Sequence, residues 1–158
     1  MKNLYLILII VFLTTNCGVI KSSNNSFEFE NGWYLETVAN NNSKPISDKF
    51  STKLFYVNPS PIVLASDYSK IGITKQNWGG KEYMLLELVF DGVEKMKWAE
   101  ATEKMSNTSE KAVFIYKDQV ISTVSAFRKM ENGYASVSSD NFTEQMLTEI
   151  LNDIKKEK

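Results

Sequence analysis

Residues 82–90 read EYMLLELVF, and residues 91–106, which follow directly, read DGVEKMKWAEATEKMS. From Met84 onward every second residue of the first segment is apolar, and most of the residues between them are apolar too, which predicts a central β-strand. One face of this strand is formed by Met84, Leu86, Leu88 and Phe90. In the second segment apolar residues recur at helical spacing, with Asp91 as a candidate N-cap. We therefore expect a strand followed by a helix that packs on its sheet.

The chain beyond this helix predicts three more strands and a second helix. Residues 112–116 (AVFIY) and 120–124 (VISTV) are rich in β-forming residues, and the three residues between them predict a hairpin turn. Residues 134–138 predict a short strand. Residues 143–156 predict the most regular helix of the chain, with Glu144 in its first turn and lysines at its end. Its apolar face is formed by Met146, Leu147, Ile150, Leu151 and Ile154.

The part before residue 82 predicts shorter strands. These are expected at 32–35, 52–57, 62–64 and 70–75, with a turn or short helix at 65–69 and a turn at 77–80. The order of elements indicates an α+β fold, with a mostly antiparallel sheet of four or five strands, two helices packed on one face, and one core. We expect the core to unite Met84, Leu86, Leu88, Phe90, Trp98, Phe114, Leu147 and Ile150.

The composition excludes several kinds of site. The 158 residues include no histidine and a single cysteine, so a zinc site, a Ser-His-Asp triad and a Cys-His pair are not expected. The formal net charge of -1 gives no basic surface for nucleic acid. Carboxylate or serine chemistry stays open as a hydrolase or transferase alternative, but no base and nucleophile can be paired. We expect no cofactor and no enzymatic activity.

The N-terminus has the pattern of an export signal. Lys2 provides a positive charge, and residues 4–13 (LYLILIIVFL) form an apolar run that is too short to span a bilayer. The run ends in Thr14-Thr15-Asn16-Cys17, which is typical of a lipobox with Cys17 as the acylated residue, although Asn16 is unusual there. The alternative is an ordinary secretory signal with an incidental cysteine. Gly18, with no acidic run behind it, favours the outer membrane, facing the periplasm.

Residues 56–154 resemble the head subdomain of the first periplasmic domain of SecD, in the SecDF protein-export family. The resemblance rests on the order and spacing of five segments: 57–63 (VNPSPIV), 86–90 (LELVF), 97–104 (KWAEATEK), 112–122 (AVFIYKDQVIS) and 141–144 (NFTE). The chain departs from the family at Val124, where a proline is usual, and at Ser139-Asp140-Asn141, where a glycine is usual. The transmembrane segments of SecD have no counterpart here, so a proton-driven cycle is not expected.

These observations divide the chain into four parts. Residues 1–16 are the expected signal peptide, 17–31 a flexible tether, 32–51 a lead-in segment, and 52–158 the domain that resembles the SecD head. The resemblance implies a module similar to one that holds emerging polypeptide, and with the expected anchor at Cys17 it leads us to expect a lipid-anchored binding module that contacts exported or unfolded polypeptide, or an envelope protein complex. The alternative is an accessory or structural lipoprotein with one dedicated envelope partner.

Two tryptophans are candidates for partner contact. Trp98 lies on the amphipathic helix and is expected in the core, although tryptophan is also enriched at binding hot spots. Trp78 precedes Gly79-Gly80, and we expect it to be the better candidate for an exposed partner-binding residue. The glycine pair itself lacks the further glycine and lysine of a phosphate loop, so it is interpreted as a turn.

Overall fold

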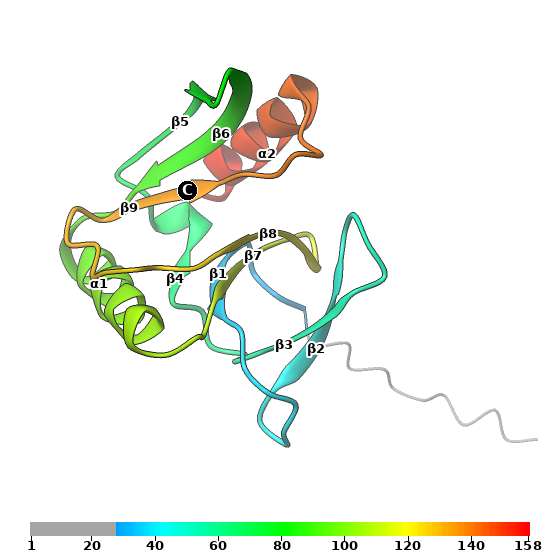
Figure 1. Cartoon of the computed structure of the whole chain (residues 1–158), viewed down its shortest axis with the longest axis vertical. Coiled ribbons are helices and arrows are strands. Elements are labelled where there is room, and N and C mark those ends of the chain that lie inside the picture. Colours follow the sequence, from blue (N-terminus) through cyan, green and yellow to red (C-terminus); the bar gives the residue numbers. More distant parts are fainter. Residues whose placement is uncertain (1–27) are drawn as a thin grey trace, which may run out of the picture.

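The computed structural model describes residues 28–158 and confirms an α+β fold (Figure 1). The helices are α1 (Gly92–Asn107) and α2 (Glu144–Glu157), with a 3-10 turn, η1, at Ala65–Asp67. The strands are β1 (Gly32–Leu35), β2 (Lys44–Asp48), β3 (Leu54–Val57), β4 (Val63–Leu64), β5 (Lys70–Trp78), β6 (Lys81–Val89), β7 (Ala112–Tyr116), β8 (Gln119–Val124) and β9 (Tyr134–Val137).

The described strands form two sheets, so the expected single sheet of four or five strands is wrong. One sheet has six strands in the order β3-β2-β8-β7-β1-β4, and the other has three in the order β5-β6-β9. Most pairs are antiparallel, as expected, but β2 and β8 are parallel. Local periodicity could not separate the sheets, because a strand pattern predicts which face is buried and not which strand lies beside it.

The six-stranded sheet curls until its first and fifth strands meet, and we call it the closed sheet. Glu36, directly after β1, forms an antiparallel bridge with Val57 of β3. Two backbone hydrogen bonds flank the bridge: Thr37 N–H donates to Tyr56 O at 2.8 Å, and Asn58 N–H donates to Leu35 O at 3.0 Å. Residues 32–51, the lead-in segment of the sequence analysis, thus supply β1 and β2 to this sheet.

The three-stranded sheet is built around a hairpin, and we call it the open sheet. β5 and β6 pair over all nine residues, from Lys70 opposite Val89 to Trp78 opposite Lys81. Gly79 and Gly80 form the two-residue turn with φ of 60° and 83°, a left-handed conformation that glycine adopts without strain. β5 is longer than the strand expected at 70–75, because residues 76–78 also pair with β6.

Two apolar clusters replace the single core that was expected. The larger one unites the inner face of the open sheet, both helices and the outer wall of the closed sheet. It contains Leu86, Leu88, Phe90, Trp98, Phe114, Leu147 and Ile150, with Met84 packed against it, as predicted. The smaller cluster fills the closed sheet with Phe29, Tyr34, Ile46, Phe55, Val57, Val113, Ile115 and Val120. β7 is buried on both faces because it separates the two clusters.

Side chains join the sheets and set the helix ends. Ser122 Oγ on β8 donates to Ser138 O at 2.8 Å and accepts from Ser138 N–H at 3.2 Å, so it links the edges of the two sheets without a strand ladder. Thr143 caps α2 by accepting from Met146 N–H at 3.2 Å. Trp98 is buried in the larger core, as expected, and its indole N–H donates to Tyr134 O at 2.8 Å.

Candidate functional site: a free strand edge

The feature that distinguishes the open sheet is β5, a nine-residue strand at its edge. β5 pairs with β6 on one side, and no strand of the described chain pairs with it on the other. In Figure 1 it runs along the outer side of the β5–β6 hairpin, away from the closed sheet. An edge of this kind presents backbone donors and acceptors in a row, ready to pair with another extended chain.

The register shows which backbone groups of β5 point outward. Strands joined by a two-residue turn exchange hydrogen bonds at the closing pair and at every second pair after it. Trp78 therefore bonds to Lys81, and the odd-numbered residues of β6 bond to β5. The even-numbered residues of β6 face β9, and Phe90, the next even-numbered residue after β6, agrees with this pattern because its N–H donates to Gly133 O at 2.9 Å. Four residues of β5 are left with outward N–H and C=O groups that have no partner among residues 28–158: Ile71, Ile73, Lys75 and Asn77.

Every other sheet edge in the described chain is short or occupied. β3 is closed by the Glu36–Val57 bridge, and Lys53 forms an ion pair with Glu36 at 3.7 Å beside it. β4 has only two residues. β9 faces β8 across the Ser122 link. Natural proteins close or shorten edges in this way to prevent unwanted pairing, so β5, the one long edge without a neighbour within residues 28–158, is a candidate for binding.

The two faces of β5 differ in chemistry. Ile71 and Ile73 point toward the larger core and are only half-buried, at its rim. α2 is the helix that packs on β5, and its half-buried Leu151 belongs to the same rim. On the opposite face Gly72 has open space around it, since an added Cβ would meet no atom within 4 Å. An added strand would thus find an apolar side and, at Gly72, free space on the other side.

A hydrogen-bonded cluster fixes the outer face of the open sheet. Tyr134 donates its hydroxyl to Glu87, and Gln76 donates its amide N–H to the same carboxylate at 3.3 Å. Burial, followed by the hydrogen bond to Glu87, raises the pKa of Tyr134 well above its usual range. The Glu87 carboxylate accepts from both donors, which closes this cluster. It holds the side chains of β5, β6 and β9 in place.

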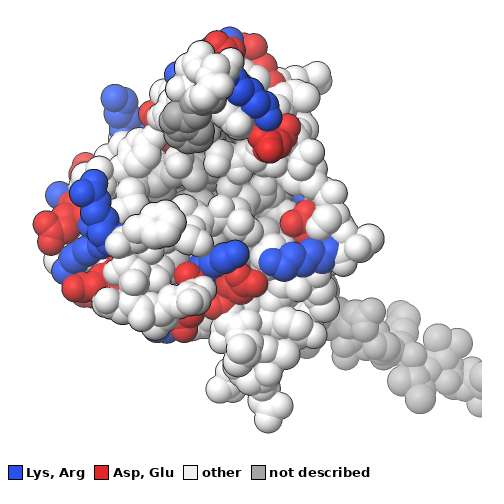
Figure 2. Space-filling view, in the orientation of Figure 1, with Lys and Arg blue, Asp and Glu red and all other residues white. Residues whose placement is uncertain are grey.

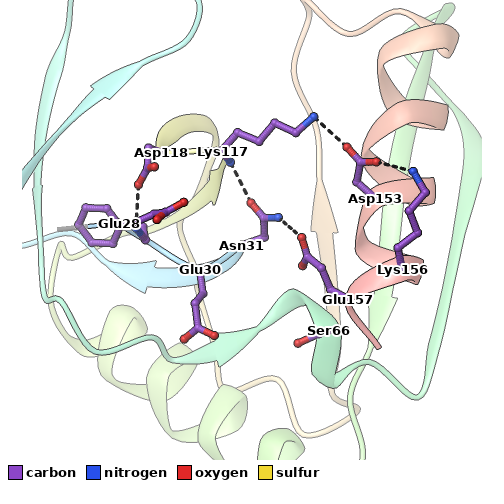
Figure 3. Close-up of a pocket in the computed structure, with 10 residues that line it drawn as sticks. Glu28, Glu30, Asn31, Ser66, Lys117, Asp118, Asp153, Lys156 and Glu157 are labelled. Atoms are coloured by element: carbon purple, nitrogen blue, oxygen red, sulfur yellow. Dashed lines mark hydrogen bonds and ion pairs between the residues drawn. The ribbon is translucent and has the colours of Figure 1, made fainter. Parts of the chain in front are cut away.

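A second group of charged residues lines a hollow between the β7–β8 turn and α2 (Figure 3). Lys117 contacts Asp153 at 2.8 Å and Glu149 at 3.2 Å, and Tyr116 donates to Asp153 at 2.7 Å. Hydrogen bonds from Lys117, Tyr116 and Lys156 hold the pKa of Asp153 well below its usual range, whereas burial raises the pKa of Tyr116 to about 12. The carboxylate is fully engaged by these donors, so the group joins α2 to the closed sheet.

The hairpin turn beside this hollow is tighter than expected. Lys117 and Asp118 form a two-residue turn, with φ of 49° and 56°, and Gln119 already pairs with Tyr116. Asp118 accepts a hydrogen bond from Phe29 N–H at 2.7 Å, and Asn31 accepts one from Lys117 N–H at 2.8 Å. These contacts attach the first described residues to the closed sheet.

The predicted site residues fall outside this edge or at its end. Cys17 and the signal sequence lie outside the described residues. The backbone of Trp78 ends β5, while its side chain is not among the described ones. Sequence reasoning missed the edge itself, because the sequence predicts a turn at 77–80, whereas Asn77 and Trp78 continue β5, and because a strand's residues do not specify its neighbours.

The rest of the described surface offers no stronger site. Figure 2 shows lysines and acidic side chains interspersed over α1, and neither sign of charge forms a continuous patch on this face. No group of three or more metal-ligating side chains occurs within residues 28–158. In the same range no helix has the length and apolar character needed to cross a bilayer.

The fold is similar to that of a known export component. The chain matches the solved structure of SecDF, a membrane component that enhances protein export, with a TM-score of 0.57 and 12% sequence identity. The match covers 80% of this chain and 63% of that one, so the chain spans less than two thirds of it. No protein-family model and no curated protein sequence matched significantly. The fold expected from the SecD resemblance is therefore confirmed, at the level of fold alone.

Proposed function

We propose that the mature chain is a lipid-anchored, non-catalytic module of the cell envelope that binds exported or unfolded polypeptide in an extended conformation. The observation that carries this proposal is the edge of β5, where the outward backbone groups of four residues have no partner within residues 28–158. Backbone pairing tolerates many sequences, because every residue except proline offers the same donor and acceptor. Such tolerance suits a protein that meets many different clients.

Two further points support the proposal. The fold is similar to that of SecDF, which enhances protein export, and the subdomain we propose as the counterpart is the head of the first periplasmic domain. A lipid on Cys17 would hold the module near the membrane, where exported chains emerge, and the expected tether would end before Phe29, which is buried in the smaller core. We propose the outer membrane, facing the periplasm, as its location.

The binding is expected to be modest, with a Kd on the order of micromolar or weaker, because ordering a flexible chain offsets part of the contact energy. The test is a titration of the chain from residue 18 onward, which includes every described element, into a labelled unfolded secretory protein. Rising fluorescence anisotropy that the folded form of the same client does not produce is the expected result. No change up to high micromolar concentration contradicts the proposal.

A dedicated accessory role is the second candidate, since a free edge also suits one folded partner with a complementary strand. A pull-down from envelope membranes separates the two roles. Many substoichiometric clients support the proposed function, whereas one stoichiometric partner supports the accessory role.

The anchor has its own experiment. Cys17→Ser is expected to abolish incorporation of radiolabelled palmitate and to move the chain from the membrane fraction to soluble or uncleaved material. Equal incorporation in wild type and variant is the result that contradicts a lipid on Cys17. Digestion by protease added to intact cells contradicts the periplasm-facing location.

A further inference from the structure

The open edge of β5 has a direction and a pattern that an incoming strand must match. A strand pairing antiparallel to β5 would place one residue opposite each of Ile71, Ile73 and Lys75, and those three residues would exchange both backbone hydrogen bonds. Directly opposite residues share a face of the sheet, with Cβ atoms about 5 Å apart. The side chains of these three β5 residues therefore determine which side chains fit on the helix side of the added strand.

The positions opposite Ile71 and Ile73 favour apolar side chains. Both isoleucines are half-buried at the rim of the larger core, and α2 packs on the same side of β5. An apolar side chain placed there would extend the core outward and remove more apolar surface from water. The two intervening residues would lie opposite Gly72, where an added Cβ meets no atom within 4 Å, and opposite Thr74, whose buried hydroxyl has no hydrogen-bond partner among the described residues, so both positions suit polar side chains.

The position opposite Lys75 favours an acidic side chain. Lys75 is exposed, and in its ion pair with Glu82, at 3.3 Å, both side chains are more than half exposed. Exposed pairs contribute little stability, so the ammonium group can engage a second carboxylate at small cost. Because antiparallel strands run in opposite directions, the residue opposite Lys75 precedes those opposite Ile73 and Ile71 in the incoming chain.

We propose that β5 selects extended segments in which an acidic residue is followed, at the second and fourth positions after it, by apolar residues, with polar residues between. This inference rests on the proposed function and names the class of polypeptide that the site takes: segments with the alternation of a half-buried β-strand. The antiparallel direction is chosen because β5 belongs to an antiparallel sheet and antiparallel pairs are slightly more stable.

The experiment uses three labelled nine-residue peptides of identical composition. One has the central order Glu-Thr-Val-Thr-Val, the second has this order reversed, and the third has the two valines adjacent. Each is titrated with the chain from residue 18 onward, alongside the unfolded secretory protein. The first peptide is expected to bind most tightly, and amide shift changes are expected at Ile71, Ile73 and Lys75.

Three variants at one exposed position make the test specific. Lys75→Pro removes the outward N–H at a site where an edge strand tolerates proline, and it should weaken the first peptide by about tenfold. Lys75→Ala keeps the N–H and should weaken it by no more than about fivefold, the range of an exposed ion pair. Lys75→Glu should prefer the same peptide with Lys in place of Glu. Thermal melts check that each variant folds, and the shift changes of the wild type locate the contact independently of them.

The outcomes separate this inference from the proposed function. If the unfolded protein does not bind, the proposed function fails. If it binds but the three peptides bind equally, or Lys75→Pro and Lys75→Ala behave alike, the selection by β5 is overturned while the proposed function stands. Tighter binding of the reversed peptide overturns the antiparallel direction. A dimer in sedimentation that Lys75→Pro abolishes assigns the edge to a second copy of the chain and overturns the inference as well.

Discussion

The two sheets of this protein differ in how their edges are paired. The closed sheet joins β1 to β3 through the Glu36–Val57 bridge and surrounds a small apolar core of its own. The open sheet ends at β5, whose outward backbone groups have no partner in the described chain. Both sheets share one large core, so the difference lies in their edges and not in how well they are packed.

The difference separates a part that supports from a part that binds. A closed edge cannot accept another strand, whereas a free edge strand can, provided that the edge strand itself is held rigidly by the rest of the protein. β5 is held by nine paired residues of β6, by α2 on its inner face and by the Gln76–Glu87–Tyr134 cluster on its outer face. A rigid edge loses little entropy when a chain pairs with it, so more of the contact energy contributes to binding.

The largest expected effect tests whether the two sheets share one core. Leu86 on β6 is fully buried in the larger cluster, so Leu86→Ala should lower the free energy of unfolding by about 2–5 kcal/mol, as large-to-small core changes do. The measurement is a urea melt. Leu54→Ala, at an exposed residue of β3, is the control and should change stability by less than about 0.5 kcal/mol. If Leu86→Ala loses as little stability as the control, β6 does not contribute to the core.

Two glycines provide a matched test of closed against open surroundings. A Cβ at Gly32 of β1 would lie 2.6 Å from Val63 O, whereas a Cβ at Gly72 of β5 would meet no atom within 4 Å. Gly32→Ala should therefore lower stability by about 1–3 kcal/mol through overpacking. Gly72→Ala should leave stability unchanged or raise it by up to about 1 kcal/mol, because the unfolded chain loses freedom. Equal losses in thermal melts of the two variants would contradict the open space beside β5.

The smallest effect concerns the charged group that joins α2 to the closed sheet. Because Lys117, Tyr116 and Lys156 lower the pKa of Asp153 in the folded state, its contribution to stability is complete above the ordinary aspartate pKa, about 4. The contribution is lost as the pH falls through the lower folded value. Asp153→Asn should flatten the decline in stability below about pH 4, measured by urea melts across that range. If the free energy of unfolding of the variant declines below about pH 4 as steeply as that of the wild type, the contact is not formed in solution.

Elements with a strong local pattern could be predicted from the sequence. The alternation in 82–90 predicted β6 and the core that it builds, and the period of 143–156 predicted α2. The residues 112–116 and 120–124 predicted the β7–β8 hairpin, with a turn one residue too long. In each case the buried face repeats along the chain, so a window of ten residues contains the information.

Features that depend on distant pairing could not be predicted. β2 reads KPISD, and only Ile46 in it is buried, so it has no periodic pattern, and its proline argues against a strand. Closure of the six-stranded sheet depends on a single bridge between Glu36 and Val57, which nothing in either segment indicates. The free edge of β5 follows from the absence of a neighbour, and a strand's own residues do not specify its neighbours.

Hydrogen exchange of backbone amides along β5 tests the central claim most directly. In the free protein, Thr74 and Gln76 bond to β6 and should exchange slowly, whereas Ile71, Ile73 and Lys75 should exchange quickly. Adding the unfolded secretory protein is predicted to slow exchange at these three outward amides while leaving the closed sheet unchanged. Slow exchange at all five amides in the free protein, or protection that arises in the closed sheet while the outward amides of β5 stay fast, would contradict the assignment of β5 as the binding edge.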